Sequence, residues 1–126
     1  MSASIQLSEA ELKIMLVLWE SSPRTMAQIT QALYAETAWS KNTVITLLKR
    51  MIAKGAVQAD ETAFPKTYAP LVDRQTMERQ ETRSLVKRLF HGSPTMLMSN
   101  MVEGGALSAA ELDEMIALLQ KKKEER

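Results

Sequence analysis

The sequence of 126 residues contains no cysteine, a single histidine, and only two each of tryptophan, tyrosine and phenylalanine. Without cysteine the chain can form neither a disulfide nor a thiolate metal site. It has no apolar run of the roughly 18 residues that a membrane span requires. Its N-terminus lacks the basic segment and apolar segment of a signal peptide. These absences predict a soluble, cytoplasmic protein with no membrane partner.

Common catalytic motifs are also missing. The sequence has no glycine-rich phosphate loop and no His-Glu-x-x-His motif, and its one histidine leaves little for acid–base chemistry near neutral pH. Glu111, Asp113 and Glu114 are clustered, but they fall near the start of a predicted helix, where the helix dipole favours negative charge. We therefore expect no enzymatic activity and no cofactor.

The residues that are present suffice for one hydrophobic core, or for a small domain with an oligomerisation element. The net charge is only +1, but the charge is segregated. No acidic residue occurs in residues 38–58, and this segment contains four cations: Lys41, Lys49, Arg50 and Lys54. The rest of the chain therefore carries −3, the difference between +1 and +4. Such local segregation is the electrostatic footprint of a nucleic-acid-binding surface.

Capping signals predict two helices before this segment. Ser8 with Glu11 and Thr25 with Gln28 have the spacing of capping boxes, and the sequence Ser21-Ser22-Pro23 ends the first helix. The predicted buried positions of the first helix are Leu12, Met15, Leu16 and Trp19. Those of the second helix are Met26, Ile29 and Leu33.

A third helix is predicted between Ser40, as the N-cap, and Gly55, just beyond the C-terminus. Its apolar face consists of Val44, Leu47, Leu48, Met51 and Ile52. The opposite face presents Asn42, Thr46 and Lys49, flanked by Thr43 and Arg50. A helix with this pattern fits a DNA major groove, where cations contact phosphates and short polar groups contact base edges. Basic amphipathic helices can also be plain solvated surfaces, so a protein-interaction module without DNA binding remains the alternative.

After the third helix, the sequence pattern changes from that of a helix to that of short β-strands. Val57–Asp60 and Lys66–Ala69 are predicted strands around the turn region Glu61–Pro65, and Pro70 ends the hairpin. A hairpin directly after a helix-turn-helix is a wing. Residues 1–72 are therefore predicted to form a winged-helix DNA-binding domain, with Lys66 on the wing as a further DNA contact.

Residues 73–126 are predicted to be helical. Helices are expected from Asp73 to about His91, from Ser93-Pro94 to Gly104-Gly105, and from Ser108 onward, with a frayed, solvated tail from Lys121. The core of the N-terminal domain does not need the apolar stripes of these helices. The helices must therefore either fold back on that domain or pair with a second copy of the chain. We expect a homodimer, because readers of double-helical DNA are often two-fold symmetric. The candidate dimerisation residues are Leu85, Leu89, Met101, Leu112, Ile116 and Leu119. The predicted fold class is thus mainly α with a small β-hairpin.

Several strings together resemble the penicillinase-repressor family of the BlaI/MecI type. They are Trp39-Ser40-x-x-Thr43-Val44-x-Thr46-Leu47-Leu48-x-Arg50-Met51-x-x-Lys54-Gly55, Tyr68-x-Pro70-Leu71-Val72, Leu89-Phe90-x-Gly92, Leu97–Val102 and Leu107-Ser108…Glu111-Leu112. The resemblance implies a winged-helix repressor that dimerises through C-terminal helices and blocks transcription from a (pseudo)palindromic operator. The residues that it and the helix pattern offer as DNA contacts are Ser40, Lys41, Asn42, Thr43, Thr46, Lys49 and Arg50.

Two differences from known family members bear on which operator sequence is bound and on whether a metal is bound. Penicillinase-repressing members tend to have a cation where this chain has Ile45, so its operator sequence need not be the same. Ile45 could contact a thymine methyl group or rest against a neighbouring helix. A sister branch binds copper(I) through Cys-x-Cys pairs, which are absent here. Met96, Met98, Met101 and His91 could suggest a thioether site, but methionine at helical spacing usually fills a core. We expect no metal site.

The resemblance also implies a route for relief of repression. In the family, a pathway that starts at a membrane sensor-protease leads to cleavage within the dimerisation region. The matching bond here is Asn100-Met101, although the family commonly has phenylalanine after the asparagine. A sensor-linked protease is thus a possible partner, and ordinary core packing of this segment is the alternative.

Overall fold

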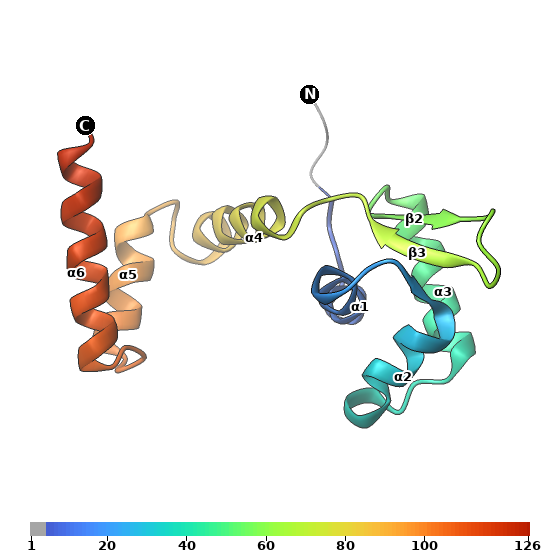
Figure 1. Cartoon of the computed structure of the whole chain (residues 1–126). Helices are drawn as coiled ribbons and strands as arrows, with labels where there is room; N and C mark the ends of the chain where they lie inside the picture. Colours follow the sequence, from blue (N-terminus) through green and yellow to red (C-terminus); the bar gives the residue numbers. More distant parts are fainter. Residues whose placement is uncertain (1–4) are drawn as a thin grey trace. The chain divides into compact units, whose positions relative to one another are not determined.

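The computed structural model describes residues 5–126 and confirms a mainly α-helical chain with a small antiparallel sheet (Figure 1). The helices within this range are α1 (Glu9–Glu20), α2 (Met26–Thr37), α3 (Lys41–Ala53), α4 (Arg74–Leu89), α5 (Pro94–Glu103) and α6 (Ala109–Glu124). The strands are β1 (Arg24–Thr25), β2 (Val57–Asp60) and β3 (Thr67–Pro70). Helices α1 to α3, followed by the β2–β3 hairpin, form the predicted winged helix-turn-helix.

The chain divides into two compact units, one ending at Gln80 and the other running from Glu81 to Arg126. The division falls inside α4, eight residues beyond the predicted limit at residue 72. The side chain of Met77 is buried, and Gln80 Nε2 donates a hydrogen bond to the Ile5 carbonyl at 2.6 Å. The first part of α4 therefore packs with the winged-helix unit.

The core of the first unit is built by one face from each of its three helices together with the hairpin. Its buried members are Ile14, Met15, Leu18, Ile29, Leu33, Val44, Leu47, Leu48, Met51, Ala56, Val57 and Tyr68. The prediction for α1 was partly wrong, because Ile14 and Leu18 occupy the core while Leu16 is exposed. Ile52 was also predicted to be buried, yet 39% of it is accessible at the edge of the α3 face.

The sheet has the strand order β1-β3-β2, with all pairs antiparallel. β2 and β3 form the predicted hairpin, in a register that pairs Asp60 with Thr67 and Val57 with Pro70. The second strand begins at Thr67 rather than at Lys66. The two-residue strand β1 was not predicted; it pairs Arg24 with Tyr68 and so adds a third strand.

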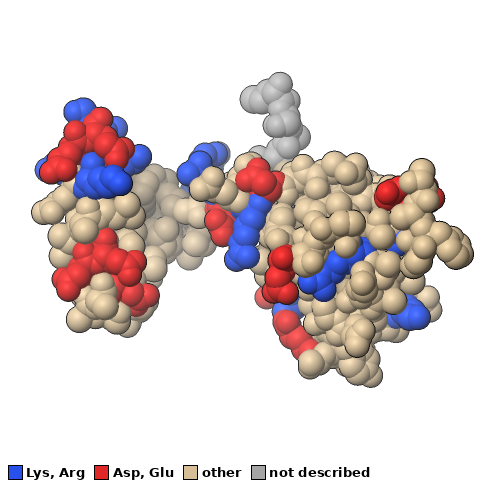
Figure 2. Space-filling view, viewed as in Figure 1, with Lys and Arg blue, Asp and Glu red and all other residues tan. Residues whose placement is uncertain are grey.

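The second unit contains α5, α6 and the C-terminal part of α4. Ser93 caps α5 and Ser108 caps α6, and Glu111 completes a capping box with Ser108. Contrary to the prediction of a frayed tail, α6 continues to Glu124, with Lys121, Lys122 and Lys123 in its last turn. Figure 2 shows acidic side chains over the N-terminal half of α6, and both basic and acidic ones near its C-terminal end.

Candidate nucleic-acid interface

The N-terminus of α3 is fixed by Ser40. The Ser40 backbone is extended, and its side-chain oxygen accepts a hydrogen bond from the Thr43 amide at 3.2 Å. The two hydroxyl oxygens of Ser40 and Thr43 lie 3.3 Å apart. This cap satisfies one of the free amides of the first turn. Both side chains remain exposed at the end of the helix that would enter a groove first.

The face of α3 that was predicted to contact DNA is exposed, while the opposite, apolar face is buried in the core. The exposed side chains are those of Lys41, Asn42, Thr43, Thr46, Lys49 and Arg50. Thr46 donates its hydroxyl hydrogen to the Asn42 carbonyl at 2.9 Å. Thr46 therefore presents a methyl group and oxygen lone pairs outward. The bond uses only the backbone carbonyl of Asn42, so the side-chain amide of Asn42 keeps both its donor and its acceptor. Ile45 is half-buried at the border of this face.

The cations of α3 are not equivalent. Within residues 5–126, Lys41, Lys49 and Arg50 form no ion pair. Lys54, in contrast, lies 2.5 Å from the buried carboxylate of Glu11 and donates to the Gln6 carbonyl at 2.7 Å. Lys54 therefore belongs to the internal structure of the unit, and three cations remain for a phosphate backbone.

The wing cation is partly neutralised. The Lys66 ammonium lies 3.6 Å from Glu61 and 5.9 Å from the centre of the Tyr68 ring. Asp60, the last residue of β2, accepts hydrogen bonds from the Thr62 hydroxyl at 2.6 Å and from the Thr62 amide at 2.9 Å. These bonds hold the pKa of Asp60 below its usual value. The charged side chains of the wing are thus engaged by neighbouring residues of the wing itself.

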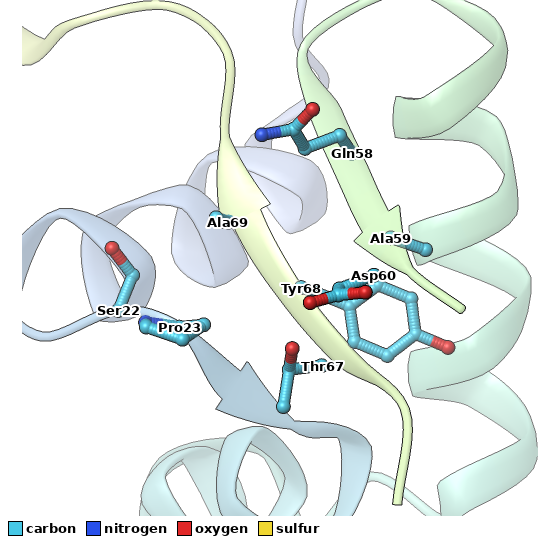
Figure 3. Close-up of a pocket in the computed structure, with 8 residues that line it drawn as sticks. All are labelled: Ser22, Pro23, Gln58, Ala59, Asp60, Thr67, Tyr68 and Ala69. Carbon is cyan, nitrogen blue, oxygen red and sulfur yellow. The ribbon is translucent and has the colours of Figure 1, made fainter. Parts of the chain in front are cut away.

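A hollow of about 390 Å³ lies over the sheet, bordered by the Ser22-Pro23 segment and by residues of β2 and β3 (Figure 3). Its lining consists of Ser22, Pro23, Gln58, Ala59, Asp60, Thr67, Tyr68 and Ala69. The single carboxylate of this lining, Asp60, is already engaged by Thr62. A general base needs a pKa near the working pH, and that of Asp60 is shifted away from neutrality. Asp60 is therefore not poised to act as a general base near neutral pH.

The candidate dimerisation residues lie in the second unit with unequal exposure. Leu89, Ile116 and Leu119 are 64%, 53% and 58% exposed. Leu85, Met101 and Leu112 are half-buried. Leu112, Ile116 and Leu119 line an apolar hollow of about 310 Å³ between α5 and α6, together with Met98, Val102 and Leu107. Asn100 and Met101, the candidate cleavage site, lie within α5.

Two kinds of feature are absent from residues 5–126, the part of the chain that the structure describes. No group of three or more His, Cys, Asp or Glu residues is placed to hold a metal ion there. No helix there is both long enough and apolar enough to cross a lipid bilayer.

The chain is similar to known repressors over nearly its whole length. It is 29% identical over 118 residues to the penicillinase repressor of Bacillus licheniformis, covering 94% of this chain and 92% of that one. It is 25% identical over 117 residues to the methicillin resistance regulatory protein MecI of Staphylococcus aureus (strain N315), covering 93% and 95%.

Solved structures match the first unit. The solution structure of the DNA-binding domain of the repressor BlaI has a TM-score of 0.52 and 32% identity, covering 59% of this chain and 90% of that one. Monomeric Bacillus licheniformis BlaI, solved in complex with the blaP half-operator, has a TM-score of 0.51 and 33% identity, covering 57% and 89%. The penicillinase repressor family model matches residues 7–121. This chain therefore belongs to the penicillinase repressor family.

Proposed function

We propose that this chain is a transcriptional repressor that binds double-stranded operator DNA by placing α3 in the major groove. The observation that carries the proposal is the exposed face of α3, where short polar side chains lie beside cations that form no ion pair with any residue the structure describes. A relative of 33% identity, BlaI, has been solved with a half-operator. Membership in a family of repressors also confirms the expectation that the chain is not an enzyme.

Roles follow from position on the helix. Asn42 and Thr46 lie at the middle of the exposed face, and Thr43 beside them, so these short side chains are assigned to base edges. Lys41, Lys49 and Arg50 are assigned to phosphates. Ser40 caps the N-terminus of α3. Its hydroxyl and the free amides of the first helical turn are assigned to the sugar–phosphate backbone of the DNA. Lys66 would join the phosphate contacts only after leaving Glu61.

Selection of duplexes from a random pool by the full chain tests this proposal. Enrichment of one sequence, bound with an affinity that falls steeply with salt, is the expected result. The three α3 cations of each copy that have no ion pair within residues 5–126, or about six in a dimer, give a slope of log K against log[salt] of about −5. A chain that enriches no sequence and shows a flat salt response would instead be a protein-interaction module.

The proposed assembly on DNA is a homodimer formed by the second unit. This unit exposes Leu89, Met96, Val102, Ile116, Leu118 and Leu119, each by 45% or more. Several large exposed apolar side chains on so small a unit favour an interaction site. Two copies joined by this surface would present two α3 helices to a (pseudo)palindromic site. Joining them also gives the second half-site a high effective concentration.

Proteolysis between Asn100 and Met101 is the proposed means of relieving repression. A cut there would separate α6 from the DNA-binding unit and remove the advantage of joined half-sites. The bond lies in the last turn of α5, where the Asn100 carbonyl accepts the Gly104 amide at 2.9 Å. A protease would need this turn to open locally, which helix ends do most easily. Mass spectrometry of the protein from derepressed cells tests the idea, and an intact chain there would exclude it.

A further inference from the structure

The turn of the wing carries a phenylalanine that takes no part in the core of the first unit. Phe64 is fully exposed, at 103% of its reference area, and Pro65 beside it is exposed as well. Tyr68, on the adjoining strand, is buried by contrast. Scattered exposed apolar residues are common on proteins. A turn, however, is normally built from small and polar residues, so an aromatic ring at this position calls for a reason.

The charges of the wing do not supply an attraction to phosphates. Asp60, Glu61 and Lys66 sum to −1. Lys66 is paired with Glu61, and Asp60 is engaged by Thr62. An apolar contact is thus one that the wing can make with DNA without first breaking these pairs. Phe64 is the large apolar side chain that its turn presents.

The hairpin that carries Phe64 follows α3 directly in the chain. β2 begins four residues after the end of α3, and the two elements are in contact. Figure 1 shows the β2–β3 turn projecting beyond the helices of the first unit, on the side of α3. A four-residue strand spans about 13 Å, and the major groove is about 12 Å wide. A turn at the end of a strand of this length could therefore reach a minor groove adjacent to the major groove that α3 occupies.

We propose that Phe64 enters the minor groove beside the half-site as an apolar wedge. The inference rests on the proposed function and adds a contact that α3 cannot make. Phenylalanine is one of the side chains that proteins insert between base steps from the minor groove. Flexible pyrimidine–purine steps yield most easily to such a wedge. Pro65 restricts the backbone of Phe64, which lowers the entropy lost when the ring becomes fixed.

The test compares Phe64→Ala and Phe64→Leu with the wild-type full chain on a half-site duplex taken from the selected sequence. Fluorescence anisotropy should show about tenfold weaker binding for Phe64→Ala, as expected for the loss of a buried aromatic contact. Phe64→Leu should stay within about threefold of wild type, because leucine also serves as a wedge. The salt slope of Phe64→Ala should equal that of wild type, since an apolar contact releases no counterions.

A matched control separates the wedge from a general loss of apolar surface. Leu71→Ala removes a side chain that is 53% exposed but lies beyond β3, away from the turn. It should leave affinity unchanged. In a duplex with 2-aminopurine at the flanking step, wild type should raise the fluorescence by unstacking, and Phe64→Ala should not.

The outcomes distinguish this inference from the proposed function. Equal affinity of Phe64→Ala and wild type would overturn the wedge alone. Weaker binding by Phe64→Ala with the 2-aminopurine signal retained would also overturn it, because the ring would then act without entering the stack. A wild-type chain that selects no duplex would overturn both. Thermal melting of Phe64→Ala should match wild type, because the ring has no contact in the fold to lose.

Discussion

Lys54, the C-cap residue of α3, lies 2.5 Å from Glu11, whose side chain is 1% exposed at the start of α1. The same carboxylate oxygen accepts the Ser8 amide at 2.8 Å and so completes the capping box of α1. One residue thus caps the first helix and fixes the end of the third. The pair thus links the C-terminal end of α3 to the start of α1.

Removal of either partner should destabilise the first unit, but unequally. Lys54→Met leaves the Glu11 carboxylate buried and without a cation, which we expect to lower the free energy of unfolding by about 3 kcal/mol. Glu11→Gln leaves Lys54, which is 37% exposed and can return to water, so the loss should be about 1 kcal/mol. Urea unfolding of both variants and of the double variant measures this asymmetry. A larger loss in Glu11→Gln than in Lys54→Met would contradict it.

The same pair should make stability depend on pH in the acid range. Burial by itself raises the pKa of Glu11, but the hydrogen bond from Lys54, the Ser8 amide and the charge of Lys54 outweigh it and lower the pKa below 4.5. A carboxylate with a lowered pKa stabilises the fold above its unfolded pKa, and this contribution disappears as the pH falls through the folded value. Stability should therefore decrease below about pH 4.5 in wild type, and less so in Glu11→Gln.

A matched control for this pH effect is Glu111→Gln. Glu111 forms the same capping box with Ser108 on α6, and the Ser108 amide likewise lowers its pKa. It is exposed, however, and no lysine within residues 5–126 is paired with it. Glu111→Gln should therefore change the acid sensitivity of the first unit little. Equal acid sensitivity of Glu11→Gln and wild type would show that the Lys54 pair is not its source.

The helix starts could be predicted from the sequence because capping is local. Each predicted N-cap serine or threonine accepts a hydrogen bond from the residue three positions ahead: Ser8, Thr25, Ser40, Ser93 and Ser108. The whole interaction lies within four residues, so the pattern alone specifies it. The exposed face of α3 was predictable for a related reason, since its apolar positions keep a regular period.

Features that depend on distant partners could not be predicted. Residues 14–19 of α1 are all apolar, so the period does not decide which side faces the core, and packing selected Ile14 and Leu18. The burial of Glu11 depends on Lys54, 43 positions away. Likewise β1 is too short to be recognised alone and exists only through its pairing with β3. At the wing, Phe64 beside Pro65 gives a visible signal, an aromatic residue in a turn.

Within α3, substitutions should separate sequence recognition from general affinity. Asn42→Ala and Thr46→Ala should each lose about 1–3 kcal/mol on the selected duplex and relax one base position. Because the Thr46 hydroxyl hydrogen is held by the Asn42 carbonyl, Thr46→Val should retain any methyl contact and lose only an acceptor. Arg50→Ala and Lys49→Ala should weaken binding to selected and random DNA alike. Equal losses on both DNAs for Asn42→Ala would place the reading face elsewhere.

Replacing Ile116 should weaken the dimer more than it destabilises the fold of a single chain. Ile116 is 53% exposed within one copy, so a large part of its side chain is free to be covered by a partner. Ile116→Ala should weaken the dimer by about 2 kcal/mol or more, a rise in the dimer dissociation constant of about thirtyfold, while the melting of the winged-helix unit stays unchanged. Sedimentation equilibrium measures the dissociation constant. Glu114→Ala, on the opposite face of α6, is the control and should leave it unchanged. If wild type is itself a monomer at micromolar concentration, the second unit does not dimerise unaided, and the two copies would be held side by side only by DNA.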